Sequence, residues 1–418
     1  MVTVVGLGFV GLTTALGFAE YGHKVYGIEI NEKRMATIQS GKLPFLEPGL
    51  DKALERHLGT NFIPTNDWET AVANSKCVYY CVGTPYGEDG QADLTYLYSA
   101  IAQTLQAIHD DRFRVLVTKS TIPPSTTEKR IIPFLEERGV KVPGQMGVAN
   151  NPEFLREGHC WEDFTHADRI VLGVSDERSE AVLRGLYEKE KAPVYCVSLN
   201  TGEFIKYLSN TSLACLISYA NEMSMAADAI GGIDTAEAFR ILHMDKRWQT
   251  GGIRAYFYPG CGYGGYCLPK DTNAFYARAK DHGFDGQILK QVISLNEEMP
   301  EVTVRRIIRT AGEDKAVCIG ILGLSFNPGS DDVRDTPSAK IIRALNEKGY
   351  RNIVAYDPVA MEEFARHYHL ACRFADTYEA LLEEAGTVAI TTAWPQFADV
   401  QTRTDVPVVD CRYMLKRG

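Results

Sequence analysis

The sequence has no hydrophobic stretch long enough to cross a membrane. Its longest apolar candidate, residues 213–220, is interrupted by Ser218 and Tyr219, and a membrane-spanning helix needs roughly 18 apolar residues. A signal peptide is not expected either, because the apolar run Val2–Val5 at the start is typical of a strand. These absences predict a cytoplasmic protein without a transmembrane segment.

Cysteines and histidines at metal-binding spacings are also missing. The 10 cysteines are scattered, without a C-x-x-C pair or a disulfide-framework spacing, which is typical of reduced thiols in a cytosolic protein. His367 and His369 lie two residues apart, so a helix would turn their rings away from each other. The sequence therefore predicts no metal site.

The chain has no excess of positive charge. Its 44 lysines and arginines against 54 acidic residues give a formal charge of -10, which argues against a nucleic-acid or anionic-membrane surface. Its 418 residues, 45% of them hydrophobic, suffice for two or three domains with cores of their own. We expect a metabolite as the partner, and this charge is compatible with a local basic pocket for a phosphorylated small molecule.

A dinucleotide-binding fingerprint is present at the N-terminus. Val2–Val5 leads into Gly6-Leu-Gly-Phe-Val-Gly11, an apolar helix follows, and a second strand over residues 24–30 carries Glu29. In this pattern the first glycine makes the tight turn, the second lets the backbone approach the pyrophosphate, and the third lets the helix pack on the strand. The pyrophosphate then lies at the helix N-terminus. The fingerprint predicts a Rossmann domain.

Glu29 predicts which dinucleotide is bound. A carboxylate at the end of the second strand accepts hydrogen bonds from the adenosine ribose and repels a 2′-phosphate, so we expect NAD rather than NADP. The alternative is that Glu29 is a solvated strand end.

Two threonines are candidates for the nicotinamide side of the cofactor. Strands over residues 77–82 and 114–118 run into polar loops with Thr84 and Thr121, and the cofactor of such a sheet lies at these loops.

A glycine-rich turn presents Cys267 at the start of a helix. The run over residues 262–272 is Gly-Tyr-Gly-Gly-Tyr-Cys-Leu-Pro-Lys-Asp-Thr, and Pro269 suits the first helical position. The amides of a helix start and the charge of Lys270 favour thiolate over thiol, which makes the cysteine a nucleophile. Together with the fingerprint, this predicts a dehydrogenase that passes its substrate through a thioester. The alternative is a buried, unreactive cysteine.

Two further segments show a clear pattern. Residues 202–230 have apolar side chains at helical intervals and more apolar surface than one buried face requires, so we expect a long helix between domains or subunits and a homodimer or higher homo-oligomer. After Pro300 the opening pattern repeats, with a strand over 316–322, the turn Gly323-Leu-Ser-Phe, a helix over 338–348 and a strand over 353–356 that ends at Asp357. Ser325 replaces the second glycine, so the ligand of this second Rossmann-like domain is expected to differ.

In this order the motifs resemble the UDP-glucose/GDP-mannose dehydrogenase family over essentially the whole chain. The shared blocks are residues 6–11, 40–49, 119–123, 151–158, 168–170, 206 with 210, 262–272, 331–334 and 410–412. The resemblance implies oxidation of the C6 alcohol of a nucleotide sugar to a carboxylate with two NAD. The predicted fold is α/β, with two Rossmann-like doubly wound domains joined by a central helical domain. The predicted boundaries are 1–198 for the NAD-binding domain, 199–300 for the central dimerisation domain and 301–418 for the UDP-binding domain.

The resemblance also implies catalytic roles. Asp271, directly or through water, takes the hydroxyl proton, and Lys206 stabilises the alkoxide together with Asn210, which lies four residues on along the same helical face. Cys267 traps the aldehyde as a thiohemiacetal that becomes a thioester, and Glu153 activates the water that hydrolyses it. The implied catalytic set is Cys267, Lys206, Asn210, Asp271, Glu153 and Thr121.

Binding residues follow from the same resemblance. For NAD they are Gly6, Gly8, Phe9, Val10, Gly11, Glu29, Arg34, Thr84, Thr121, Glu157 and Arg334. For the nucleotide sugar they are Phe154, Leu155, Arg156, Lys206, Asn210, Arg247, Tyr256, Tyr258, Gly264 and Arg412. The simpler alternatives are a solvated lysine for Lys206, a helix cap or partner of Lys270 for Asp271, surface acids for Glu153 and Glu157, and structural salt bridges for Arg334 and Arg412.

Several departures leave the sugar open. Tyr266 replaces the family's usual serine before the nucleophile, Asn327 replaces a common lysine, and the loop after Arg247 is longer, which makes Arg254 a substitute candidate for Arg247. The Lys-Asp-Thr after the cysteine resembles the branch that converts UDP-glucose to UDP-glucuronate. The alternatives are the same chemistry on a UDP-N-acetylhexosamine, UDP-galactose or GDP-mannose, a two-electron dehydrogenase that stops at the aldehyde, and a non-catalytic nucleotide-sugar-binding protein.

Overall fold

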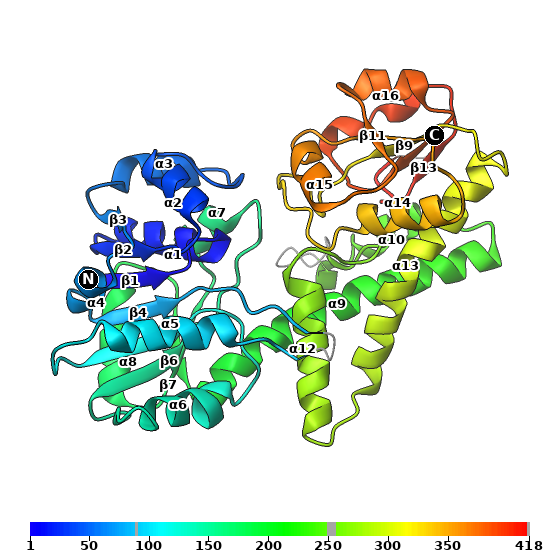
Figure 1. Cartoon of the computed structure of the whole chain (residues 1–418). Coiled ribbons are helices and arrows are strands. Elements are labelled where there is room, and N and C mark those ends of the chain that lie inside the picture. The colour runs from blue at the N-terminus through cyan, green and yellow to red at the C-terminus, as the bar shows by residue number, and fades with distance from the viewer. Residues whose placement is uncertain (88–90, 249–255, 416–418) are drawn as a thin grey trace. The chain divides into compact units, whose positions relative to one another are not determined.

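The structure is a computed structural model that describes residues 1–87, 91–248 and 256–415. The chain divides into two compact units, Met1–Ser209 and Asn210–Gly418, and the division falls inside helix α9 (Leu199–Ile230). Each unit has its own sheet with helices packed on it (Figure 1). The predicted fold class, two Rossmann-like α/β sheets and a helical segment with one long helix, is confirmed.

Within the described residues, the first unit contains an eight-stranded sheet in the order β3-β2-β1-β4-β5-β6-β7-β8. Its first six positions repeat the 3-2-1-4-5-6 strand order of dinucleotide-binding folds. Among the strands that the structure describes in this sheet, β6 and β7 are the one antiparallel pair. The strands are β1 (Val2–Val5), β2 (Val25–Ile28), β3 (Phe62–Pro64), β4 (Cys77–Tyr80), β5 (Arg114–Thr118), β6 (Met146–Asn150), β7 (Ile170–Val174) and β8 (Val194–Val197).

Side chains of each strand alternate between two helical layers, because successive residues of a strand face opposite sides of the sheet. Cys77 and Tyr79 of β4 pack into one core, and Val78 and Tyr80 pack into the other. Helices of the first layer include α1 (Phe9–Glu20), α3 (Leu50–His57), α7 (Cys160–Thr165) and α8 (Glu177–Leu186). The second layer includes α4 (Trp68–Ala73), α5 (Thr95–Gln106), the π-helix η1 (Thr127–Ile131) and α6 (Ile132–Glu136). Helix α2 (Glu32–Gln39) follows β2.

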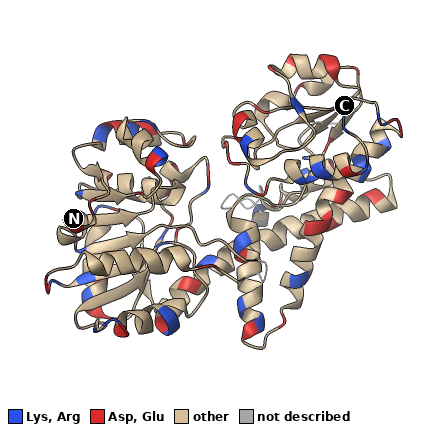
Figure 2. Cartoon of the chain, viewed as in Figure 1, with Lys and Arg blue, Asp and Glu red and all other residues tan. Residues whose placement is uncertain are grey.

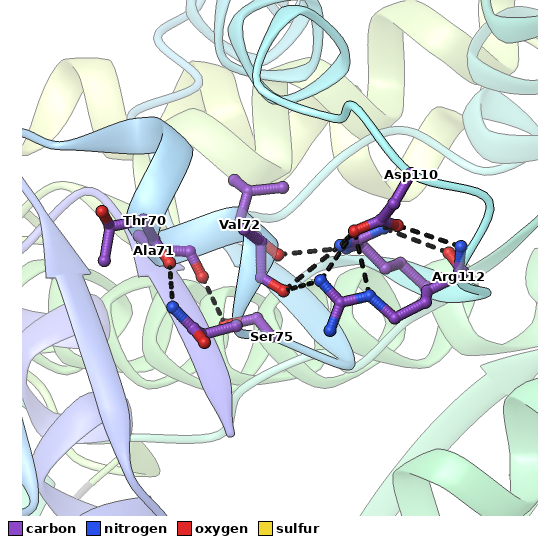
Figure 3. A network of polar contacts seen from close by, with 9 residues as sticks. Thr70, Ala71, Val72, Ser75, Asp110 and Arg112 are labelled. Carbon is purple, nitrogen blue, oxygen red and sulfur yellow. Dashed lines mark hydrogen bonds and ion pairs between the residues drawn. The ribbon is translucent and has the colours of Figure 1, made fainter.

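A buried arginine ties the start of β5 to the end of α4. Arg114 is 1% exposed, and its guanidinium donates to the carboxylate oxygens of Asp110 at 2.7 and 2.9 Å and to the carbonyl oxygen of Val72 at 3.0 Å. Arg112 donates to Asp110 and to the carbonyl of Ala73 in the same network (Figure 3). The hydrogen bonds from Arg114 and Arg112 lower the pKa of Asp110. The two arginines also donate to the carbonyl of Ala73, which the end of the helix leaves without a helical partner.

Replacing Arg114 by methionine is expected to lower the free energy of unfolding by about 2–3 kcal/mol, because charge-assisted hydrogen bonds to Asp110 and a hydrogen bond to the carbonyl of Val72 are lost, although each acceptor keeps another donor. A urea titration followed by circular dichroism would measure this loss. Arg112→Met is the matched control, because Arg112 is 64% exposed on the same network and exposed pairs contribute little. Equal losses in the two variants would contradict the assignment.

The second unit carries a parallel sheet that is five-stranded within the described residues, in the order β11-β10-β9-β12-β13. The strands are β9 (Ile319–Leu322), β10 (Ile353–Tyr356), β11 (Arg373–Phe374), β12 (Thr387–Ile390) and β13 (Val408–Asp410). Its helices are α10 (Thr235–Leu242), η2 (Lys246–Trp248), α12 (Cys267–Asp281), α13 (Gln287–Ala311), α14 (Pro337–Glu347), α15 (Met361–His367), α16 (Tyr378–Glu384), η3 (Pro395–Phe397) and α17 (Val400–Arg403). No helix in the described ranges is long and apolar enough to span a membrane.

Some elements differ from their prediction. The long helix begins at Leu199 rather than at residue 202, and β6 to β8 were not predicted. Pro300 lies inside α13 rather than before a new domain; a proline there removes the hydrogen bond to the carbonyl four residues back, and its ring crowds that carbonyl. The predicted boundary at 300/301 thus falls within a helix, and the domain boundaries stay a prediction.

Candidate active site

The glycines after β1 have the conformations that the fingerprint predicts. Gly6 has φ +88°, and a Cβ atom there would lie 2.9 Å from the carbonyl oxygen of Cys81. A Cβ atom on Gly11 would lie 1.7 Å from the carbonyl oxygen of Gly6. Gly8 caps α1 without a side-chain hydrogen bond, and a Cβ atom on it would meet nothing within 4 Å. The helix start therefore faces open space, which fits a pyrophosphate.

Glu29, directly after β2, is not a solvated strand end. It is 4% exposed, and its carboxylate accepts from the backbone N–H of Leu7 at 3.1 Å and of Asn31 at 2.8 Å. Arg34 donates to it at 3.0 Å from a side chain that is 40% exposed. The burial rules out the solvated alternative, and the carboxylate is held against the glycine turn. The ribose contact stays a prediction.

Two threonines of the predicted cofactor set lie together. The hydroxyl of Thr84, in the loop after β4, donates to the carbonyl of Thr121, in the loop after β5, at 2.9 Å. Phe9 stacks on Phe45 with a centroid distance of 4.0 Å, and Val10 lies in the first turn of α1. The structure therefore places these residues around the carboxyl ends of β1, β4 and β5, where such sheets bind nucleotides.

Lys206 and Glu153 form a buried ion pair in the first unit. The ammonium of Lys206, on α9, lies 2.7 Å from Oε1 of Glu153, and their side chains are 5% and 6% exposed. The other carboxylate oxygen of Glu153 accepts from the backbone N–H of Leu155 at 2.6 Å. Neither residue is therefore a solvated surface group. Burial alone would raise the pKa of Glu153, but the charge and hydrogen bond of Lys206 lower it.

Lys119, at the end of β5, is a second buried cation that the sequence analysis gave no role. Its ammonium donates to the side-chain oxygen of Asn151 at 3.1 Å, and the hydroxyl of Tyr187 donates to the same oxygen at 2.5 Å. Burial lowers the pKa of Lys119 to about 8, although Cys81 and Glu153 oppose that shift. A lysine directly after a buried strand was the signal that could have drawn attention to it.

The lowered pKa of Lys119 predicts a pH-dependent stability. Above pH 8 the folded chain releases this proton, whereas the unfolded chain holds it up to the ordinary value of 10.5. The unfolded state then binds more protons, so this contribution to stability rises with pH across that window by up to about 3 kcal/mol. The difference in melting temperature between the wild type and Lys119→Met is expected to grow in favour of the wild type from pH 8 to 10. A flat difference would contradict the shift.

The other residues of the 151–158 block that were predicted to bind ligands have partners of their own or are half-buried. The ring of Phe154 has the guanidinium of Arg169 at 4.0 Å from its centre. Arg156 pairs with Asp163, with Nε 3.0 Å from Oδ2, and is 50% exposed. Leu155 and Glu157 are half-buried. Their binding roles stay predictions.

In the second unit, Cys267 is the first residue of α12, with Tyr266 as the N-cap. Pro269 is thus the third helical residue rather than the first, still within the turn whose N–H groups have no helical partner. Cys267 is half-buried. Burial alone would lower the pKa of Lys270, but the charges of Asp271 and Cys267 raise it. The sulfur therefore lies within electrostatic range of a buried ammonium, which is what a thiolate needs.

Asp271 is fully buried and has partners on both carboxylate oxygens. Lys270 forms an ion pair with Oδ1, and the amide of Asn210 donates to Oδ2 at 2.6 Å. The structure therefore shows the ion pair with Lys270 that was the simpler alternative to a catalytic role for Asp271. It does not exclude a catalytic role, which stays a prediction.

Asn296 on α13 holds the glycine-rich turn in place. Its side-chain oxygen accepts from the backbone N–H of Tyr263 at 2.7 Å, and its amide donates to the carbonyl of Tyr263 at 3.1 Å. Gly262 has φ +94°, and a Cβ atom there would lie 2.7 Å from that oxygen. Sequence reasoning missed Asn296, because nothing in its own segment distinguishes it from a surface polar residue.

The rest of the turn packs on the segment before α14. A Cβ atom on Gly264 would lie 2.6 Å from the carbonyl oxygen of Asp335, which explains the glycine. The guanidinium of Arg334 lies 4.6 Å from the ring centre of Tyr266, and its Nε lies 2.9 Å from the carboxylate of Asp332. Arg334 therefore makes a structural salt bridge, which was the alternative to NAD binding, and it lies beside the cysteine turn.

Arg412 differs from Arg334 in having an unsatisfied donor. Its Nε is buried and has no hydrogen-bond partner among the described residues, while its Nη1 lies against Gly260, where a Cβ atom would come within 2.8 Å. The hydroxyl of Tyr258 donates to the carbonyl of Tyr413 at 2.8 Å, and Tyr256 is half-buried. An orphaned buried donor fits a nucleotide phosphate. The side chain of Arg247 and all of Arg254 lie outside what the structure describes.

The turn Gly323-Leu-Ser-Phe after β9 has the same arrangement as the glycine turn after β1, but side chains fill the space that is open at Gly8. Asp357 accepts from the N–H groups of Leu324 and Ser325 at 2.7 and 3.1 Å, as Glu29 does from Leu7. The hydroxyl of Ser325 and the indole of Trp394 also donate to Asp357. Ser325 is 1% exposed, so this turn does not offer the open helix start seen at Gly8. The predicted difference between the two ligands agrees with this geometry.

Three family matches cover most of the chain. The NAD binding domain of the UDP-glucose/GDP-mannose dehydrogenase family matches residues 1–191. The central domain of that family matches residues 200–298, and its UDP binding domain matches residues 320–417. The three matches follow the order that the motifs predicted.

Individual relatives agree over nearly the full length. The UDP-glucose 6-dehydrogenase of Rhizobium meliloti (strain 1021) is 36% identical over 411 residues, which are 95% of this chain and 90% of that protein. The solved UDP-glucose dehydrogenase of Pyrobaculum islandicum has a TM-score of 0.91 at 38% identity, covering 99% and 96% of the two chains. The UDP-D-ManNAc dehydrogenase of Pyrococcus horikoshii has a TM-score of 0.87 at 26% identity, covering 100% and 97%.

Proposed function

Because the chain belongs to the UDP-glucose/GDP-mannose dehydrogenase family, we propose that it oxidises the C6 alcohol of UDP-glucose to the carboxylate of UDP-glucuronate. The family makes it an NAD-dependent nucleotide-sugar dehydrogenase. Two observations support glucose as the sugar: the names of the relatives at 36% and 38% identity, and the Lys270-Asp271-Thr272 sequence after the cysteine, which resembles that branch.

The observation that carries the proposal is the position of Cys267. Its sulfur lies at the start of α12, within electrostatic range of the buried Lys270. A helix N-terminus and an ammonium both stabilise a thiolate. A thiolate is required only if the reaction passes through a covalent intermediate, because removal of one hydride from an alcohol needs no nucleophile.

NAD, when bound, accepts a hydride from the carbon that is oxidised. The open helix start at Gly8 and the carboxylate of Glu29 suit its pyrophosphate and its adenosine ribose. Thr84 and Thr121 are proposed to contact the nicotinamide side, together with Glu157. Arg34, beside Glu29, is proposed to flank the adenosine.

For the alcohol, we assign the proton to Asp271 and the charge on the developing alkoxide to Lys206 and Asn210. Asp271 has no exposed surface, so the proton passes directly from the hydroxyl or through one ordered water. The ammonium of Lys206 lies at a buried position, where it would stabilise an oxyanion more strongly than in water.

For the aldehyde, the sulfur of Cys267 bonds to C6 and the aldehyde oxygen takes a proton, which gives a thiohemiacetal. The thiohemiacetal hydroxyl then loses its proton and C6 loses its second hydride, which a second NAD would accept, and this leaves a thioester on the same sulfur. Glu153 then takes a proton from water, the hydroxide adds to the thioester carbonyl, and the C–S bond breaks to release the carboxylate and the thiolate. The lowered pKa of Glu153 keeps its carboxylate ionised for this step.

Stoichiometry tests the proposal. Two NADH and one carboxylate per UDP-glucose are expected, measured by absorbance and by mass spectrometry of the product. One NADH per sugar would favour a dehydrogenase that stops at the aldehyde, and none with detectable sugar binding would favour a binding protein. A parallel screen of UDP-galactose, the UDP-N-acetylhexosamines and GDP-mannose decides the sugar, and a higher kcat/KM for any of them would replace UDP-glucose.

A homodimer or higher oligomer through α9 and α10 is proposed as well. Large apolar side chains are exposed along these helices: Tyr219 is 52%, Ile230 is 75% and Ile241 is 54% exposed. Exposed large apolar side chains on these two consecutive helices are typical of an interface. Light scattering is expected to give at least twice the chain mass of 46.4 kDa, and the double variant Ile230→Glu with Ile241→Glu is expected to reduce the measured mass to that of the monomer.

A cytoplasmic location is proposed too. All 10 cysteines are free, which supports it.

A further inference from the structure

A small polar cavity lies in the second unit, and none of the residues assigned to the reaction lines it. Its volume is about 200 Å³, and it lies between the end of α13, the edge strand β13 and the start of α10. Neither Cys267 nor Arg412 lines it. The polar side chains in its wall are Arg306, Arg309, Thr310, Gln401, Asp410 and Tyr413.

Arg306 is a mostly buried cation with poor hydrogen-bond partners. Its side chain is 20% exposed, and its Nε lies 3.8 Å from the carboxylate of Asp228, which is beyond hydrogen-bond distance. Its guanidinium carbon lies 4.9 Å from the ring centre of Tyr413. None of its donors has a hydrogen-bond acceptor within the described part of the chain. A guanidinium has five N–H donors, so this one retains capacity for a ligand.

Arg309 follows three residues later and lines the same cavity, as side chains at i and i+3 of a helix do. It is exposed and makes no ion pair with any residue that the structure describes. The central turns of α13 carry Glu297, Glu298 and Glu301, whereas its last turns carry the arginines (Figure 2). The two charges of Arg306 and Arg309 therefore gather at one end of the helix, against the cavity.

The carboxylates beside the cavity do not neutralise this pair. Asp410 accepts from the backbone N–H groups of Arg412 at 3.0 Å and Leu415 at 2.7 Å, one on each oxygen. Asp228 is 41% exposed and touches only the edge of Arg306. The cavity therefore presents two guanidinium groups with unused donors, and no acid is bound tightly to either of them.

We propose that this cavity binds the phosphate group of a small molecule, either orthophosphate or a phosphate monoester, at Arg306 and Arg309. Guanidinium groups bind phosphate oxygens through pairs of parallel hydrogen bonds, and a dianion matches two cations better than a carboxylate does. The volume suits a phosphate group, because pockets for drug-sized molecules begin at about 300 Å³. The hydroxyl of Thr310 and the amide of Gln401 offer further polar contacts in the wall.

Calorimetric titration of the full chain with inorganic phosphate tests the site. Saturating NAD and UDP occupy the phosphate-binding places of the reaction, and sodium chloride holds the ionic strength constant. The wild type is expected to bind one phosphate in a saturable manner, with Kd in the millimolar range. Arg309→Gln is expected to weaken this binding at least tenfold, and because Arg309 is exposed this variant should fold normally.

Arg305→Gln is the matched control, since Arg305 lies on the same helix, is 60% exposed and pairs with Glu298 rather than lining the cavity. It is expected to keep the wild-type affinity, and both variants are expected to keep the wild-type rate of NADH formation. Glucose 1-phosphate in place of phosphate distinguishes the sources: tighter binding identifies a monoester, and weaker binding identifies orthophosphate. Absence of saturable binding, equal affinity in Arg309→Gln, or acetate binding as tight as phosphate would overturn the proposal.

Discussion

Cys267→Ser is expected to bind the nucleotide sugar with unchanged affinity and to form no carboxylate. A serine hydroxyl at this place is not ionised at neutral pH, so it cannot trap the aldehyde in the way a thiolate does. The rate of acid formation should fall by a factor on the order of 10³ or more, as it does when a covalent nucleophile is removed. Product analysis by mass spectrometry, beside an NADH assay, measures the loss.

The control for this variant is a cysteine of similar exposure elsewhere in the second unit. Cys372 is half-buried and follows α15, so Cys372→Ser is expected to keep the wild-type rate. Sugar binding in Cys267→Ser, followed by calorimetry, separates loss of chemistry from loss of folding. Carboxylate formation at the wild-type rate in Cys267→Ser would remove the covalent step from the mechanism.

Glu153→Gln should stop the reaction one step later. An amide cannot take the proton of the attacking water, so the thioester on Cys267 is expected to accumulate while both oxidations still proceed once. Rapid mixing should show a burst of two NADH per active site, and steady turnover should then be slower by a factor of about 10² to 10⁴. Mass spectrometry of the intact chain should show the added mass of the UDP-sugar acyl group.

The charge balance at Lys206 must be checked in the same experiment. Glu153 is its partner at 2.7 Å, and a buried charge that loses its partner destabilises a fold. The glutamine still offers an oxygen acceptor, and the burst itself shows whether the site is intact, because an unfolded variant has none. Glu162→Gln, at an exposed position on α7, is the control. Full steady turnover without an adduct would assign the water-activating step to another residue.

The elements around the glycine turns follow closely from the local sequence. The ends of β5 and β10 are the predicted ones, and α9 differs by three residues at its start. Buried strands can be recognised as apolar runs in the sequence. Gly6 can be recognised too, because at φ +88° a side chain is strained and its Cβ atom would collide with the carbonyl of Cys81. The edge strands β7 and β8 were missed because they follow segments whose pattern is mixed, although each pairs with its nearest neighbour in the chain.

The amino-acid sequence alone determined the order of the elements around the two Rossmann-like turns, the glycine turn with Glu29 after it, and Cys267 at a helix start. These features depend on residues close together in the chain, whose spacing and φ preferences act locally. Only the tertiary structure decided which buried groups meet: Lys206 with Glu153, Lys119 with Asn151, and Asn296 with Tyr263. A buried charge or amide must find a partner to offset the loss of water. Which partner it finds depends on packing between distant segments.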